Sequence, residues 1–258
     1  MTAHKGPRLT RHDGTFHRIN GEQLMSADTA AITLSGGPVI TPTRREEVAM
    51  RIRRALLAGE LKPGQRITEV HLAEALGVSR PTVRESLQQL IHEGLLVQVP
   101  YKGIHVAQPT REELADIAEV RTALETMAAL KLCRDLHSPG MEAVREALRA
   151  HLGALDSGDE LRSDLTHLAL HQAIWEQSGS ATLAKMWPVI GSQIHVALTV
   201  DQAAVRDPER VRRMHRRLVQ VIEKGDEAAI TAEVRAHVQD SLDELIPRLD
   251  QPQRPRNA

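Results

Sequence analysis

Four histidines in the C-terminal half of the chain are spaced so that their imidazoles could meet. His167 and His171 are four residues apart and would share one face of a helix. His215 lies ten residues before Gly225, and His237 follows that glycine by twelve. If the two segments form antiparallel helices joined at Gly225, each histidine lies about 15 Å from the turn and the two come level. Three helices could therefore direct four imidazoles to one point.

Imidazole is the commonest side chain for transition-metal ions, and an i, i+4 pair with two further histidines suits such an ion. We expect a divalent transition metal, zinc or nickel foremost, held by these four side chains. Two interpretations stay open beside it: a histidine cavity that binds a small ligand directly, and ordinary surface or core histidines. Trp175, one turn after His171, could line the same cavity or simply pack, and His195 on the next helix could face inward.

A second group of residues suits the major groove of DNA. Gly77 supplies the backbone freedom of a tight turn, and Ser79 can cap the helix that follows. Arg80, Thr82 and Arg84 would then face outward at the N-terminal end of that helix. Guanidinium groups bind phosphate, or the O6 and N7 edge of guanine, in a bidentate manner. A solvated two-helix hairpin with incidental arginines is the alternative.

Two short β-prone runs follow, at 97–99 and 104–106, around a tip at 100–103. Two strands around a glycine-containing tip predict a hairpin, with Lys102 at its apex to lie against the DNA backbone. Together with the helices before it, this hairpin predicts a winged helix-turn-helix.

The segment 43–107 resembles the N-terminal domain of GntR-family transcription factors almost continuously. The resemblance rests on the runs AGELKPG at 58–64, LGVSR at 76–80, TVRE at 82–85 and EGL at 93–95. It implies that Arg80, Thr82 and Arg84 contact bases and phosphates of the recognition site. It also implies that Gly103 enters the minor groove, and Ser79 and Lys102 complete the expected DNA-contacting set.

From Pro109 onward the pattern is that of long helices, at 110–136, 138–157, 159–178, 180–200, 207–224 and 226–249. Capping residues precede them and the connections are short, which predicts an antiparallel all-helical bundle. The expected fold is therefore mainly α, with an N-terminal winged helix-turn-helix at 43–107 and a helical domain at 108–250. Residues 1–42 are expected to be a disordered extension and 251–258 a frayed tail.

The bundle resembles the FCD ligand-binding domain of the FadR-type branch of the same family. In that branch an aspartate and three histidines hold a divalent metal beside an effector cavity. His171, His215 and His237 match the histidines, but His167 stands at the aspartate position. Arg121 matches an arginine that points into the cavity, so the resemblance implies a small carboxylate effector.

Charge and composition agree with a cytoplasmic DNA-binding protein. Residues 43–107 hold ten Lys and Arg against seven Asp and Glu, whereas 108–258 hold nineteen against twenty-four. The single cysteine, Cys133, excludes an intramolecular disulfide, and no apolar run approaches the roughly 20 residues of a membrane span.

We therefore expect a transcriptional regulator, a repressor foremost, that binds a double-stranded operator as a homodimer, because one winged domain offers few base contacts. A metal-dependent enzyme housed in the bundle is the alternative. No general base is evident beside the histidines, and an enzyme leaves the N-terminal domain unexplained, so we do not expect an enzyme.

Overall fold

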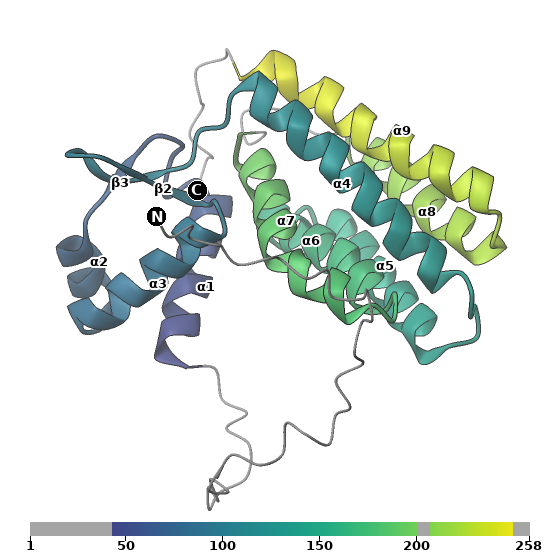
Figure 1. The fold of residues 1–258 in the computed structure, drawn as a ribbon, viewed down its shortest axis with the longest axis horizontal. Helices are drawn as coiled ribbons and strands as arrows, with labels where there is room; N and C mark the ends of the chain where they lie inside the picture. The colour runs from purple at the N-terminus through teal and green to yellow at the C-terminus, as the bar shows by residue number, and fades with distance from the viewer. Residues whose placement is uncertain (1–42, 201–206, 250–258) are drawn as a thin grey trace, which may run out of the picture. The chain divides into compact units, whose positions relative to one another are not determined.

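The computed structural model describes residues 43–200 and 207–249, in which helices dominate (Figure 1). A winged helix-turn-helix is followed by an all-helical bundle, so the predicted fold class is confirmed. The predicted extension at 1–42 and the tail at 251–258 lie outside the described residues.

The helices of the winged domain begin and end where the local sequence requires. In α1 (Arg44–Leu57), the Thr43 hydroxyl accepts a hydrogen bond from the Glu46 amide at 3.3 Å, and the Glu46 carboxylate accepts one from the Thr43 amide at 2.7 Å. Between α2 (Glu69–Leu76) and α3 (Arg80–His92), Gly77 adopts the left-handed conformation with φ +64°. A side chain is strained there, so glycine is what allows the sharp turn between the two helices.

The wing is a three-stranded antiparallel sheet in the order β1-β3-β2. Strands β2 (Leu96–Val99) and β3 (Gly103–Val106) form the predicted hairpin, in which Leu96 pairs with Val106. Strand β1 (Arg66–Ile67) pairs with β3 and was not predicted. Two residues are too few for an alternating pattern to be visible in a sequence.

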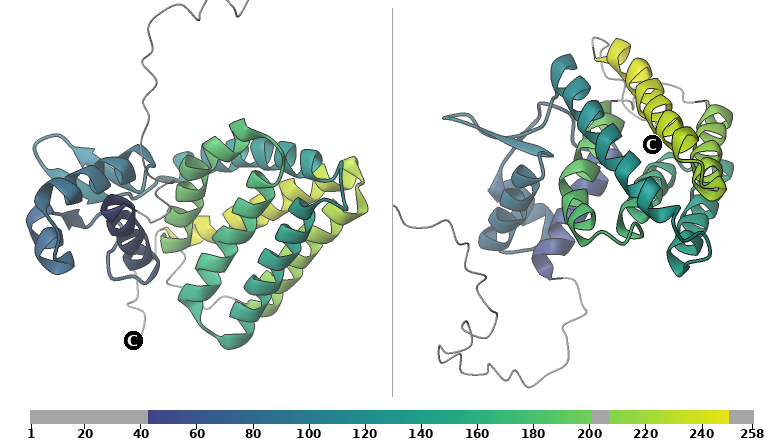
Figure 2. Two further views of the ribbon diagram at one scale, coloured as in Figure 1. Left: turned by 90° about the horizontal axis from the view of Figure 1, so that it is seen from below. Right: turned by 45° about the vertical axis from the view of Figure 1, so that its right-hand side comes forward.

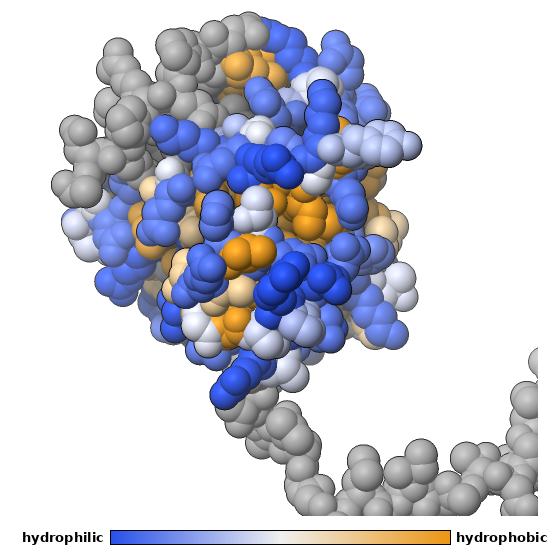
Figure 3. All heavy atoms as spheres, turned by 90° about the vertical axis from the view of Figure 1, so that its left-hand side faces the viewer, coloured by the Kyte–Doolittle hydropathy of each residue, from blue (hydrophilic) through white to orange (hydrophobic). Residues whose placement is uncertain are grey.

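The apolar core of the winged domain lies between its helices and its sheet. Its fully buried members come from α1, α3 and the start of β2, and the largest are Ile52, Leu56, Leu87, Leu90, Leu95 and Leu96. Hydrophilic side chains cover most of the coloured face shown in Figure 3, and apolar side chains gather in its middle.

The bundle contains the helices α4 (Arg111–Leu132), α5 (Pro139–Ser157), α6 (Glu160–Glu176), α7 (Ala181–Val200), α8 (Pro208–Lys224) and α9 (Glu227–Leu245), followed by a 3₁₀ turn, η2 (Ile246–Arg248). Helix α4 ends four residues before its predicted end. In Figure 2, α4 lies beside α9, and α5 lies beside α6 and α8. The bundle core contains Leu170, Ile174, Leu218 and Ile222, so α6 and α8 contribute apolar faces to the same interior that receives their histidines.

Replacing Gly77 by alanine tests the turn. No atom lies within 4 Å of a Cβ built at Gly77, so the expected loss of about 1 kcal/mol in the free energy of unfolding comes from the backbone alone. Gly153, in the middle of α5, also has an open environment, but its backbone is helical. Gly153→Ala should therefore stabilise by roughly 0.5–1 kcal/mol. Urea denaturation measures both, and shifts of the same sign would contradict this account.

Candidate functional site

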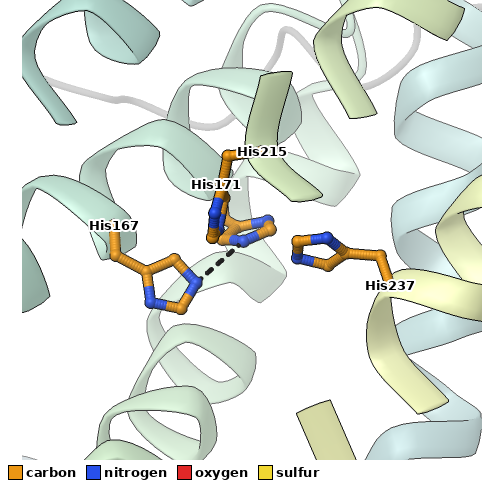
Figure 4. A group of neighbouring side chains, drawn as sticks. All are labelled: His167, His171, His215 and His237. Carbon is orange, nitrogen blue, oxygen red and sulfur yellow. Dashed lines mark hydrogen bonds between the residues drawn. The ribbon is translucent and has the colours of Figure 1, made fainter. Parts of the chain in front are cut away.

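The four predicted histidines meet inside the bundle (Figure 4). His167 and His171 come from α6, His215 from α8 and His237 from α9, and one ligand nitrogen from each lies within 4.8 Å of all the others. The ring centroids of His215 and His237 are 4.9 Å apart, and those of His171 and His237 are 5.2 Å apart. The antiparallel α8 and α9 thus place two histidines at the same level, opposite the pair on α6.

The turn between α8 and α9 sets this level. Gly225 ends α8 in the left-handed conformation with φ +71°, and the Asp226 carboxylate then accepts hydrogen bonds from the amides of Ala228 and Ala229. A glycine that stops one helix beside an aspartate that starts the next makes a short, defined reversal. His215 and His237 are consequently held in register by residues that lie a full three turns away.

His171 has the most defined hydrogen bonds of the four. Its Nδ1 lies 2.5 Å from Glu125 Oε1, and because a carboxylate can only accept, Nδ1 carries the proton. Its Nε2 lies 3.2 Å from Arg121 Nη2 and 3.0 Å from His167 Nε2. Nε2 therefore holds the lone pair of the neutral ring and points toward the other imidazoles.

Arg121 and Glu125 form a buried ion pair one turn apart on α4. Arg121 Nε donates to Glu125 Oε2 at 2.9 Å, and the two side chains are 8% and 1% exposed. Burial by itself raises the pKa of Glu125, but the contacts with His171 and Arg121 outweigh it and hold that pKa well below its usual value. The pair thus places one positive and one negative charge beside His171.

Several nitrogens of the cluster are buried without a hydrogen-bond partner among the described residues. They are His215 Nε2 and both ring nitrogens of His237. Burial lowers the pKa of His167, His215 and His237 well below the usual value, so these rings are neutral and offer lone pairs. Neutral, convergent imidazole nitrogens are the donor set that zinc and nickel prefer, so these residues fit such an ion.

Two members of the site were missed by the sequence analysis. Glu125 follows Arg121 by four residues, and that spacing on one helix was the available signal. His151 on α5 is 1% exposed, and its ring centroid lies 4.6 Å from that of His215. Its Nδ1 lies 3.2 Å from the hydroxyl of Thr166. No short spacing relates His151 to the other histidines, so only the packed fold brings it to them.

Of the two further residues considered for the cavity, Trp175 takes the packing role and His195 lies outside the histidine cluster. Trp175 is fully buried in the apolar core, where its ring lies 5.7 Å from that of Trp187. His195 does not join the histidine cluster, because its Nε2–H donates to the backbone carbonyl of Arg53 in α1 at 2.9 Å. The expectation that His195 faces the cavity is therefore wrong: it lies on the side of α7 that faces the winged domain.

The predicted DNA-contacting residues lie at the start of α3 and on the wing. Arg80 and Arg84 have side chains that are 61% and 57% exposed. Both Arg84 Nε and Nη2 donate to the Glu69 carboxylate at 2.8 Å, so the guanidinium plane is already oriented. The Ser79 hydroxyl accepts from the Thr82 amide at 3.3 Å, which makes Ser79 the cap of α3.

At the wing tip, Lys102 is exposed and Gly103 has φ +93°. A Cβ on Gly103 would lie 3.4 Å from Nε of Arg66, so this exposed arginine of β1 adds a positive charge beside the tip. Arg66 was missed because the strand that carries it was not predicted. The basic side chains of α3 and of the wing are suited to a polyanion.

Comparisons with known proteins match the two domains separately. A family model described as bacterial regulatory proteins of the gntR family matches residues 44–106, and the model of the FCD domain matches residues 116–240. A search for helices that could cross a membrane found none among the described residues.

Similar proteins cover most of the chain. The uncharacterized HTH-type transcriptional regulator YdhC of Bacillus subtilis is 24% identical over 76% of this chain and 88% of its own length. A probable D-xylose utilization operon transcriptional repressor of Paenarthrobacter nicotinovorans is 26% identical over 75% of this chain and 88% of its own length. The solved structure of E. coli McbR/YncC has a TM-score of 0.69 at 23% identity, covering 80% of this chain and 99% of that one, and so shares the fold.

Acid should destabilise the metal-free protein. Burial lowers the pKa of His167, His215 and His237, and that of His195 to about 4, whereas unfolded histidine titrates near about 6.5. Below that value the unfolded chain binds more protons, so the free energy of unfolding should fall by about 1.4 kcal/mol per pH unit for each such ring. Urea denaturation in EDTA at about pH 7.5 and about pH 5.5 tests this. His195→Gln should reduce this fall in the free energy of unfolding, and His92→Gln, at an exposed position, should not. An equal fall in the wild type and both variants would contradict the contribution assigned to His195.

Proposed function

Because this chain belongs to the GntR family of bacterial regulatory proteins and carries an FCD domain, we propose that it is a transcriptional repressor controlled by a small organic acid. It would bind its operator as a cytoplasmic homodimer and sense the acid in the helical bundle. The observation that carries this proposal is the cluster of four imidazoles, three of them buried, beside the Arg121–Glu125 pair, in the same chain as a winged helix-turn-helix.

The winged domain supplies the DNA-binding end of this function. Arg80 and Arg84 sit at the amino end of α3, where the free amides add partial positive charge. Glu69 holds the Arg84 guanidinium in a fixed plane, and DNA would replace this carboxylate by a phosphate or a guanine edge. Lys102 and Arg66 would add backbone contacts from the wing.

The bundle supplies the sensing end. We propose that His167, His171, His215 and His237 hold a zinc or nickel ion, and the unpartnered nitrogens of His215 and His237 support this. When bound, the ion would offer a Lewis-acidic position for an oxygen of the effector. Glu125 would keep the proton of His171 on Nδ1, so that Nε2 remains available to the ion.

The charges of the site favour an anionic effector. Arg121 and Glu125 cancel each other and the four imidazoles are neutral, so a divalent ion leaves the site with two uncompensated positive charges. A carboxylate would compensate one of them, and Arg121, whose Nη2 lies 3.2 Å from His171 Nε2, would bind its second oxygen. We expect the effector to bind far more tightly to the metal-loaded protein than to the metal-free one.

The alternative of a metal-dependent enzyme gains no support from these comparisons. The curated relatives reported above are named as transcriptional regulators or repressors. An enzymatic role in the bundle would also not explain why Glu69 orients the exposed Arg84 guanidinium.

Loss of Arg84 tests the DNA-binding role. Arg84→Ala should weaken binding to a duplex selected in vitro by about tenfold or more and should lower the slope of affinity against salt concentration by about one. Arg162→Ala removes the same charge from an exposed position of α6 and should leave both unchanged. Fluorescence anisotropy over a series of KCl concentrations measures both variants. Unaltered affinity in Arg84→Ala would refute the role of α3.

Loss of one histidine tests the metal site. The wild-type protein should retain about one equivalent of zinc or nickel per chain, and His237→Ala should weaken the binding by about 100-fold or more. His137→Ala, at an exposed position outside the cluster, is the matched control and should keep full metal content. Elemental analysis and calorimetric titration measure the two effects. Full metal content in His237→Ala would overturn the site.

A further inference from the structure

The winged domain and the bundle exchange one apolar side chain each. Leu57, the last residue of α1, is fully buried and belongs to the core cluster of the bundle. Val196 of α7 is 3% exposed and belongs to the core cluster of the winged domain. A side chain that leaves its own domain for the core of another makes the two cores continuous at this contact.

A polar layer surrounds this apolar contact. Both carboxylate oxygens of Glu93 accept from Arg53 Nη2, at 2.7 and 2.5 Å, within the winged domain. From α7, the Ser192 hydroxyl donates to Glu93 Oε2 at 3.4 Å and Gln193 Nε2 donates to the Glu93 carbonyl at 3.3 Å. His195 donates to the Arg53 carbonyl at 2.9 Å. Three polar side chains of α7 thus bond to two residues of the winged domain.

The close approach at Gly94 shows how tightly the surfaces meet. A Cβ on Gly94 would lie 2.2 Å from Gln193 Nε2, and Gly94 has φ +79°, where a side chain is strained in any case. His195, buried at this contact, has its pKa lowered to about 4 by desolvation and is therefore a neutral donor. The contact is consequently close, and three side chains of α7 donate hydrogen bonds across it.

A continuous packed route joins this contact to the histidine cluster. Trp175 follows His171 by one turn on α6, and its ring packs against Trp187 of α7. Gly191 leaves room for the Trp187 ring, since a Cβ there would lie 2.7 Å from Trp187 Cε2. One residue later the α7 surface that meets the winged domain begins. Pro188, next to Trp187, removes one backbone hydrogen bond within α7.

We propose that the α7 face from Ser192 to Val196 is a docking surface for the winged domain, and that ligand binding at the histidine cluster strengthens this docking. This inference rests on the proposed function, because it takes the cluster as the sensing site. Binding that orders α6 and its tryptophan contact leaves less conformational entropy to lose when the winged domain docks, so the two events favour each other. The effector would therefore control the orientation of the winged domain by favouring its docked state.

Hydrogen exchange of the full chain, with and without Ni²⁺, separates the two claims. In the wild type, Ni²⁺ should slow exchange in α6, α8 and α9, which reports the metal site. It should also slow exchange about fivefold or more at 53–57 and 93–95 of the winged domain, which reports docking. Protection confined to the bundle would overturn the coupling and leave the proposed function standing. Protection in neither region would overturn the metal site and the coupling together.

Substitutions on α7 isolate the docking surface. Val196→Asp places a charge in the apolar contact, and should speed exchange at 53–57 and 93–95 without metal and abolish the Ni²⁺ effect there, while metal binding to the bundle persists. Val189→Asp is the matched control, since Val189 is 40% exposed on the same helix. Should Val196→Asp fail to fold by circular dichroism, His195→Ala removes one hydrogen bond from the same surface. Exchange at 53–57 as slow in the folded variant as in the control would overturn the docking surface.

Discussion

The main physical constraint on the bundle is that its buried imidazole nitrogens require a hydrogen-bond donor, an acceptor or a metal ion as a partner. Four rings on three helices converge within 4.8 Å, and three of their nitrogens have no partner among the described residues. An unsatisfied buried polar atom costs about 1–3 kcal/mol, so an apolar replacement would make the empty fold more stable. The cluster therefore makes physical sense as a site for an ion or ligand that supplies the missing contacts, and the stability of the domain becomes linked to that occupant.

Arg121 and Glu125 decide what the occupant can be. The pair adds no net charge to the four neutral rings, but it sets the proton position on His171 and brings a guanidinium beside the rings. With it, Glu125 orients His171 and Arg121 offsets the carboxylate, so the site is neutral when empty and positive when an ion is bound. In the proposed function an anion would then bind as the partner of the ion. The two positive charges of the bound ion would repel a second cation. A site of this kind would therefore hold one ion and an anion, and would not accumulate metal.

The features of the fold and the site that could be predicted from the sequence are those set by residues close together in the chain. The convergence of the four histidines followed from an i, i+4 spacing and from distances to Gly225, because helix geometry and one turn determine both. His151 and the orientation of His195 depend on how α5 and α7 pack, and no local spacing contains that information. Helix α7 is largely apolar, so its pattern does not say which face meets the winged domain. Arg66 was missed because a two-residue strand has no period.

Two Arg–Glu pairs in the winged domain, Arg53–Glu93 and Arg84–Glu69, differ in burial and therefore in how easily their partners can be replaced. Glu93 is 6% exposed and shares its carboxylate between Arg53 and Ser192 of α7, so removing Arg53 would leave a buried charge uncompensated. Glu69 and Arg84 are 22% and 57% exposed, and water can replace either partner at little loss. In the proposed function the exposed pair would exchange its carboxylate for DNA, whereas the buried pair would hold the orientation of the domain. A binding event in the bundle would then reach the DNA by changing how the recognition helix is presented, while the residues that read the bases stay the same.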